Sequence, residues 1–261
     1  MASEAYKMDL SINEFEKRFG VIGKQPAKCE QHGDFIQVLR RDHEPSGCPV
    51  CAEAKREEEQ YQLRLEAFVG RHMPRAGIPR RFAGKSFDTY ESKNAKQRRA
   101  LEICCNYVDD FRNHAKAGRC LLLLGNVGTG KTHLACAIAD FLIRHRMVSA
   151  MYRTVGDIMV TIRSTYDGGE GSEHDILREL SGCGLLVLDE VGATKPTEFE
   201  HATLFKIINA RYERCLPTIV ISNLGATDLS TALGERCVDR LRENGGIAVS
   251  FDWASKRGER A

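Results

Sequence analysis

Residues 120–132 read CLLLLGNVGTGKT, so that four leucines lead directly into a glycine-rich loop. The loop has the spacing G-x-x-x-x-G-K-T of a P-loop, whose backbone wraps around phosphate groups. The leucines predict a strand that is buried on both faces, and apolar residues at helical spacing follow from 133 to 145. A chance glycine turn would not be flanked in this way by a buried strand and a helix. The stretch therefore predicts a nucleotide-binding loop.

The residue types in the loop indicate how ATP and Mg²⁺ would be held. Glycines let the backbone approach a phosphate closely, and the backbone N–H groups at the helix N-terminus face the anion. The lysine would reach the β- and γ-phosphates, and the threonine after it would hold Mg²⁺. The predicted nucleotide-binding residues are Gly125, Asn126, Val127, Gly128, Thr129, Gly130, Lys131, Thr132 and His133.

A second buried strand, LLVLDE at 185–190, ends in two acidic residues. Ligands of parallel sheets gather at the carboxyl ends of the strands. We expect Asp189 to support Mg²⁺ together with Thr132, and Glu190 to activate the attacking water as a general base. With Lys131, these acids are the predicted catalytic residues of an ATPase.

A third apolar strand, TIVISN at 218–223, ends in Asn223, which we expect to orient the water or to sense the γ-phosphate. Strands that alternate with helical segments predict an α/β fold with a parallel sheet. The predicted strands are CLLLL at 120–124, VSAMYR at 148–153, LLVLD at 185–189, TIVIS at 218–222 and IAVSF at 247–251.

Composition describes a soluble globular protein, with 42% hydrophobic and 28% charged residues. The 261 residues have room for one large domain and one small domain. No apolar run reaches the roughly 20 residues that span a bilayer, and the N-terminus lacks the apolar core of a signal peptide. We therefore expect a cytoplasmic protein without membrane contact, whose cysteines are reduced. Seven of the 10 cysteines lie in the ATPase part, and most of these are expected to be small core residues.

The net charge of +2 is unevenly distributed along the chain. Residues 71–100 contain nine Lys and Arg against Asp88 and Glu91, a local balance of +7. Such a stretch either contacts nucleic-acid phosphates or is a solvated linker, and its composition leaves both interpretations open.

Four residues near the N-terminus have the spacing of a zinc site. Cys29 and His32 form one close pair, Cys48 and Cys51 form another, and 15 residues separate the pairs. Three thiolates and one imidazole on two turns suit a closed, tetrahedral, structural Zn²⁺ site. A redox role for the C-x-x-C pair is less favoured because no thioredoxin-like βαβ pattern surrounds it.

A charged helix is predicted at 52–73, and it is followed by the helix breakers Pro74, Gly77 and Pro79. We therefore expect two domains. Residues 1–76 would form a zinc-binding and helical partner-docking module, and residues 77–261 would form the ATPase domain.

Several further blocks occur in a fixed order along the chain. They are GIPRRFAGKSFDTY at 77–90, the P-loop, LLVLDEVG at 185–192, TIVISNL at 218–224, LGERCVDRLRENG at 233–245 and VSFDWASKR at 249–257. Together they resemble AAA+ ATPases of the DnaC type, the loaders of bacterial replicative helicases. Residues 152–180 resemble the helical insert of initiators and helicase loaders.

The resemblance implies an AAA+ sheet with strand order 5-1-4-3-2 and an ATP-dependent homo-oligomer. Arg240 matches the arginine finger, which acts on ATP held by the neighbouring subunit, and Arg236 is the second choice for this role. Arg257 matches an arginine that contacts ATP in its own subunit. The resemblance also places Arg163 and Tyr166 in one contact with single-stranded DNA.

A second DNA contact is implied for Thr197 and Phe199. For Phe199 the alternative is that it packs a helix against the sheet.

The resemblance implies a function as an ATP-dependent loader of the replicative DNA helicase, of the DnaB type, during the initiation of DNA replication. DnaC-like proteins do not all have a Cys/His module, and others meet the helicase through a purely helical N-terminus. The implied helicase-docking part of this chain is residues 1–76. Two alternatives remain open. One is an IstB-like transposition helper ATPase, and the other is a zinc-dependent adaptor that binds nucleotide without productive turnover.

Overall fold

The computed structural model describes residues 10–166 and 171–255. The chain separates into two compact units, Met1–Glu66 and Ala67–Ala261. This division falls within a helix and lies ten residues before the boundary predicted from the sequence at 76/77. Among the described residues, no helix is both long and apolar enough to cross a membrane.

The N-terminal unit contains a short helix, a hairpin and most of a long helix. These elements are α1 (Glu14–Arg18), β1 (Val21–Cys29), β2 (Gly33–Arg40) and α2 (Pro49–His72). The strands pair antiparallel, with Cys29 opposite Gly33 at the turn. Helix α2 confirms the helix predicted at 52–73, although α2 begins three residues earlier, at Pro49. The hairpin was not predicted.

The second unit is built on a five-stranded sheet whose paired strands all run parallel. Its strand order is β4-β5-β6-β3-β7. Numbered 1 to 5 along the chain and read from β7, this is the order 5-1-4-3-2, so the predicted topology is confirmed. The strands are β3 (Leu121–Gly125), β4 (Ala150–Thr154), β5 (Leu185–Val191), β6 (Thr218–Ser222) and β7 (Ile247–Phe251).

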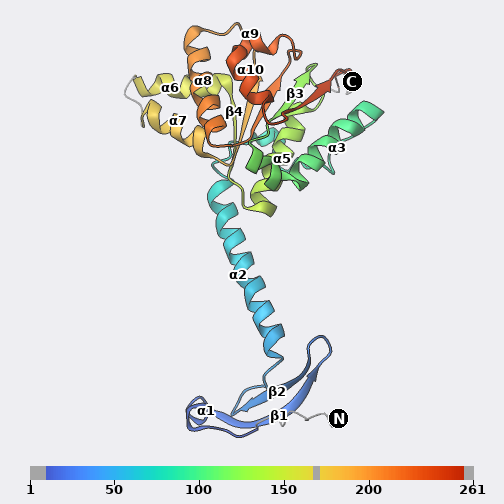
Figure 1. The fold of residues 1–261 in the computed structure, drawn as a ribbon, viewed down its shortest axis with the longest axis vertical. Coiled ribbons are helices and arrows are strands. Elements are labelled where there is room, and N and C mark those ends of the chain that lie inside the picture. Colours follow the sequence, from blue (N-terminus) through green and yellow to red (C-terminus); the bar gives the residue numbers. More distant parts are fainter. Residues whose placement is uncertain (1–9, 167–170, 256–261) are drawn as a thin grey trace. The chain divides into compact units, whose positions relative to one another are not determined.

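Alternate residues of each strand face opposite sides of the sheet, and both sides are covered by helices. Leu121 and Leu123 pack on one side with α5, whereas Leu122 and Leu124 pack on the other with α8. The first side carries η1 (Arg80–Phe82), α3 (Ala95–Asp109), α4 (Phe111–Ala117) and α5 (Lys131–Arg146). The second carries α6 (Val155–Tyr166), α7 (Glu173–Gly182), α8 (Glu198–Glu213), α9 (Leu229–Leu233) and α10 (Glu235–Arg242) (Figure 1).

The cysteines of this unit are mostly core residues, as the composition predicted. Cys104, Cys120, Cys136, Cys183 and Cys237 are buried, Cys105 is half-buried, and Cys215 is exposed.

Candidate functional site

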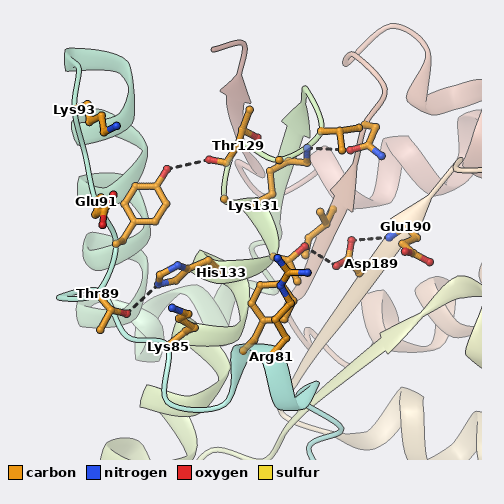
Figure 2. Close-up of a pocket in the computed structure, with 18 residues that line it drawn as sticks. Arg81, Lys85, Thr89, Glu91, Lys93, Thr129, Lys131, His133, Asp189 and Glu190 are labelled. Atoms are coloured by element: carbon orange, nitrogen blue, oxygen red, sulfur yellow. Dashed lines mark hydrogen bonds between the residues drawn. The ribbon is translucent and has the colours of Figure 1, made fainter. Parts of the chain in front are cut away.

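A cavity of about 800 Å³ lies at the carboxyl ends of β3, β5 and β6, where the P-loop, Asp189, Glu190 and Asn223 meet (Figure 2). This volume is within the usual range for a small-molecule site, roughly 300–1,000 Å³. The lining residues are Arg81, Phe82, Lys85, Thr89, Tyr90, Glu91, Lys93, Val127, Gly128, Thr129, Gly130, Lys131, Thr132, His133, Asp189, Glu190, Ile221 and Asn223.

Two glycines of the P-loop are required by close approach and by backbone conformation. Gly125 has φ +121°, and a Cβ there would lie 2.6 Å from the Phe251 carbonyl oxygen. Gly130 has φ +99°, and a Cβ there would lie 2.7 Å from the Tyr90 ring. Side chains at these positions would be strained and would also collide with their neighbours. The loop can therefore keep this path only with glycine at both positions.

Segments from both ends of the ATPase unit fix the P-loop. The Thr129 carbonyl accepts hydrogen bonds from the Tyr90 hydroxyl (3.3 Å) and from Trp253 Nε1 (3.1 Å). The Asn126 backbone N–H donates to Phe251 O over 2.8 Å, and its side chain donates to Trp253 O over 3.2 Å. The loop is thus held in shape by protein contacts, and its conformation is preorganised.

Lys131 begins α5 and lies at the base of the loop. Its ammonium donates to the carbonyl oxygens of Gly125 and Asn126, both over 2.6 Å, and to Asn223 Oδ1 over 3.0 Å. The predicted lysine and the predicted strand-end asparagine are therefore in direct contact. This places a cation beside the side chain that we expect to sense the γ-phosphate.

Asp189 is 5% exposed and accepts three short hydrogen bonds. Its Oδ2 accepts from Thr132 Oγ1 (2.9 Å) and from the Tyr152 hydroxyl (2.6 Å), and its Oδ1 accepts from the Glu190 N–H (2.6 Å). Burial, and then the hydrogen bond to Asp189, raise the pKa of Tyr152 well above its ordinary value, so its hydroxyl is a donor. Because the Thr132 hydroxyl donates its hydrogen bond to Asp189, the lone pairs of the Thr132 oxygen stay available for a cation. Hard oxygen donors of this kind fit Mg²⁺.

Glu190 is exposed and lines the cavity, as a group that activates water must. Its φ of +59° is unusual for a residue with a side chain, and it falls where the register between β5 and β6 shifts. Such backbone strain concentrates at functional sites. Glu190 is exposed at this irregularity, whereas the preceding Asp189 is buried.

One wall of the cavity was not predicted as part of the nucleotide site. Residues 81–93 supply seven of its lining residues, among them Arg81, Lys85 and Lys93 (Figure 2). The segment is attached to α5, because His133 Nε2 contacts Ser86 O at 2.9 Å. The excess of positive charge at 71–100 was the available signal. The structure places three of these cations in the lining of the cavity that also contains the P-loop. The sequence had suggested either a nucleic-acid contact or a solvated linker for this stretch, and neither of these is a nucleotide-site wall.

The predicted arginine finger, Arg240, lies on α10 and does not line the cavity of its own subunit. Its guanidinium donates to Asn209 Oδ1 over 2.8 Å and lies over the rings of Phe205 and Tyr212. Arg236, the second choice, is exposed one helical turn earlier. Arg257 lies outside the described residues.

The four predicted DNA-contacting residues do not form one cluster of contacts. On α6, Arg163 is exposed, and Tyr166 is 60% exposed with its hydroxyl bonded to Glu173. Thr197 caps the N-terminus of α8 by accepting the Glu200 N–H, and Phe199 packs partly buried against the core. Thr197 and Phe199 therefore each have a structural role, helix capping and core packing, that does not involve DNA.

The four predicted zinc ligands converge at the hairpin turn and the start of α2. Cys29 and His32 flank the turn, while Cys48 and Cys51 lie at the helix N-terminus, and all four ligand atoms lie within 4.8 Å of one another. Four of the separations are 3.3 to 3.8 Å. A zinc tetrahedron with Zn–S of about 2.3 Å and Zn–N of about 2.0 Å places neighbouring ligand atoms about 3.5 to 3.8 Å apart.

The donor set and its spacing therefore fit zinc. Backbone N–H groups of Gln31 and His32 lower the pKa of Cys29 to about 6, which favours the thiolate that binds metal.

Comparison with known proteins agrees with this geometry. The family model for the IstB-like ATP binding proteins matches residues 57–241, which is 185 of the 261 residues. The chain belongs to this family. It is accordingly an ATPase of the AAA+ class, and the matched region contains the P-loop, Asp189, Glu190 and Asn223. The Cys/His cluster lies outside the match to the IstB-like family.

Relatives of this IstB-like ATPase include replicative helicase loaders. The chain is 32% identical over 200 residues to the replicative helicase loader DnaC of Buchnera aphidicola subsp. Acyrthosiphon pisum (strain APS), covering 76% of this chain and 78% of the relative. It is 33% identical over 183 residues to DnaC of Escherichia coli (strain K12), covering 70% and 73%. A crystal structure of the DnaC helicase loader superposes with a TM-score of 0.60 at 26% identity, covering 66% of this chain and 99% of that one.

Proposed function

We propose that this chain is an ATP-dependent loader of a replicative DNA helicase, of the DnaB type, which acts in the initiation of DNA replication. The observation that carries the proposal is the similarity to DnaC loaders over about three-quarters of both chains, 76% and 78%, together with a cavity lined by the P-loop, Asp189, Glu190 and Asn223. ATP would act as a switch, because contacts that differ between the ATP-bound and ADP-bound states bias assembly and release.

At the ATP site, each residue contributes a separate function. Lys131 would exchange its carbonyl partners for the β- and γ-phosphates, and Thr132 and Asp189 would hold Mg²⁺, which offsets the charge of the transferring phosphoryl group. Glu190 would take the proton of the attacking water, and Asn223, already in contact with Lys131, would orient that water.

Completion of the site would require a second copy of the chain. Arg240 lies away from the cavity of its own subunit, which suits a residue that acts in trans. Its guanidinium would stabilise charge on the phosphoryl group of the neighbour. Arg257 would contact ATP within its own subunit. The active species would therefore be an ATP-dependent homo-oligomer.

The oligomer would hold single-stranded DNA through the residues on α6. Arg163 offers a cation for phosphate, and Tyr166, 60% exposed, offers a ring for base stacking. Such pairs suit binding without sequence preference. Thr197 and Phe199 are weaker candidates for a second contact, since capping and packing already occupy them.

The N-terminal module, residues 1–76, would dock the helicase, and Zn²⁺ on Cys29, His32, Cys48 and Cys51 would hold its fold. Zinc with four protein ligands has no open position for water, so its role is structural. Localisation would be cytoplasmic, where the helicase and the DNA are found.

The proposal is tested by mixing purified protein, a bacterial replicative helicase and ATP in size-exclusion chromatography. We expect co-elution with the full chain, loss of co-elution with Cys48→Ser, and retained ATP turnover by that variant. Absence of co-elution with several helicases, while single-stranded DNA still stimulates turnover, would contradict the loader function.

A second candidate is a transposition helper of the IstB type, which the matching family description favours. Such a protein would bind duplex DNA and a transposase. Competition between duplex and single-stranded oligonucleotides of equal length separates the two functions. Preference for the single strand supports the loader, and preference for the duplex supports the helper.

The zinc-dependent adaptor without turnover is excluded if Glu190→Gln abolishes both ATP hydrolysis and loading. Unchanged helicase loading by Glu190→Gln would support the adaptor, which needs no ATP hydrolysis.

A further inference from the structure

We propose that Tyr152 is a positioning residue for Mg²⁺ that acts through Asp189. This inference rests on the proposed ATPase chemistry and adds a residue that neither the P-loop nor the two strand-end motifs contain. Tyr152 lies on β4, the strand beside β5, and its side chain is 5% exposed in the core between the sheet and α5. Its hydroxyl donates to Asp189 Oδ2 over 2.6 Å.

The strand register explains how a core tyrosine reaches the site. Tyr152 pairs with Val187, and Thr154 pairs with Asp189. Tyr152 therefore lies beside the β5 position two residues before Asp189, and its side chain is on the same face of the sheet as Asp189. The length of the side chain brings its hydroxyl to the carboxyl end of the strand. The ring packs like the other apolar residues of this face, so packing alone requires only a phenylalanine. The hydroxyl is the part whose contact is specific to Asp189.

The hydrogen bonds of Asp189 show what this hydroxyl controls. Oδ2 is shared by Thr132 and Tyr152, whereas Oδ1 accepts from the Glu190 N–H. With all three donors in place, neither carboxylate oxygen can rotate without breaking a short bond. The same orientation keeps the Thr132 proton directed at Asp189, and so keeps the Thr132 oxygen available to the cation.

Without the Tyr152 hydroxyl, one donor to the buried carboxylate is lost, and Thr132 alone remains on Oδ2. The carboxylate and the threonine would then fluctuate, which weakens the cation site while the P-loop keeps its shape. Residues that support metal ligands in this way typically change metal affinity about 10- to 100-fold when they are removed. We expect a change near the lower end of this range because Thr132 and Glu190 remain.

The test is Tyr152→Phe in the full-length protein, with Tyr107→Phe as the matched control. Tyr107 is also buried and its hydroxyl donates to Arg119 O over 2.8 Å, away from Asp189. Binding of a fluorescent ATP analogue is titrated with MgCl₂, and binding is also measured in EDTA. Tyr152→Phe should require about tenfold more Mg²⁺ for half-maximal binding. Its binding in EDTA should match that of the unaltered protein, and its ATP turnover should recover at high Mg²⁺.

Three outcomes would overturn the proposal. In the first, Tyr152→Phe has the Mg²⁺ midpoint of the unaltered protein. In the second, Tyr107→Phe shifts the midpoint equally, which would reduce the effect to a general loss of stability. In the third, the unaltered protein binds the analogue without any dependence on Mg²⁺. The helicase takes no part in this titration, so failure of the loader function and failure of this proposal are distinguishable.

Discussion

The two units of this chain reach their folds by different means. In the ATPase unit, strands such as β3 are buried on both faces, and two layers of apolar side chains cover the sheet. Among residues 10–66, only Val21 and Cys48 are buried apolar residues. Burial of one leucine contributes roughly 1.5–3 kcal/mol, so the small unit has little stabilisation of this kind.

The Cys/His cluster can supply what the small core lacks. Zinc binding to small metal-dependent domains is worth about 10–16 kcal/mol, comparable to the burial of several large side chains. The N-terminal unit should therefore depend on a metal for its fold, whereas the ATPase unit should not. Each of the following substitutions should therefore alter the folding or the activity of mainly one unit.

The largest effect is expected from loss of a zinc ligand. Cys48→Ser should reduce bound zinc from one per chain to a small fraction and should unfold the hairpin, because three ligands hold the metal far less tightly. Zinc content and hydrogen exchange over residues 21–40 check this. Cys215→Ser, which alters an exposed cysteine of the ATPase unit, is the control and should change neither quantity. Equal hydrogen exchange in both variants would show that the hairpin folds without metal.

The next effect concerns chemistry in the ATPase unit. Glu190→Gln should lower kcat for ATP hydrolysis by about 10²–10⁴-fold while ATP binding persists, since the general base is lost and the P-loop is retained. Steady-state turnover and nucleotide binding measure this, with the exposed Glu102→Gln as control. Mixing Glu190→Gln with Arg240→Ala should restore part of the activity, because some sites then combine an intact base with an intact finger. No recovery in the mixture would contradict the action of Arg240 in trans.

The sequence predicted one of these regions better than the other. The strand, P-loop and helix of the ATPase unit were predictable because their signal is local, in four leucines followed by the loop. The hairpin was missed because β1 contains Gly23 and Pro26, which argue against a strand. Both strands of a two-stranded sheet are edges, and an edge strand tolerates proline.

The wall at 81–93 and the role of Tyr152 were missed for another reason. Arg81, Lys85 and Lys93 reach the cavity only because contacts such as Tyr90 to Thr129 and Ser86 to His133 attach their segment to the P-loop and α5. Tyr152 meets Asp189 through the pairing of β4 with β5. The positive charge at 71–100 marks the segment, but the sequence has no pattern for either of these contacts.

A pair of leucine truncations compares a buried leucine of the ATPase unit with an exposed leucine of the N-terminal unit. Leu123→Ala, at a fully buried position of β3, should lower the free energy of unfolding by about 2–5 kcal/mol. Leu63→Ala, at a position of α2 that is 66% exposed, should change it by no more than about 0.5 kcal/mol. Chemical denaturation checks both values. A large effect at Leu63 would reveal that this part of α2 is buried in solution, for example in an oligomer.

The smallest effect is expected in DNA binding. Tyr166→Ala should weaken binding of single-stranded DNA by about 1–3 kcal/mol if one base stacks on this ring. Tyr61→Ala, which removes a half-buried ring from α2 in the N-terminal unit, is the control. Fluorescence anisotropy with a labelled oligonucleotide measures both. A loss caused by Tyr61→Ala alone would move the DNA contact from α6 to the N-terminal unit.

The loader function is tested most directly by the transfer of a replicative helicase onto closed circular single-stranded DNA, measured as helicase bound to the circle after filtration. We expect the full chain with ATP to increase this transfer. Cys48→Ser should abolish the transfer while it still turns over ATP, and Glu190→Gln should abolish it while it still binds zinc. Transfer by Cys48→Ser at the level of the unaltered protein would contradict the assignment of helicase docking to the zinc module. An absence of transfer by the unaltered protein, with several helicases, would contradict the loader function itself.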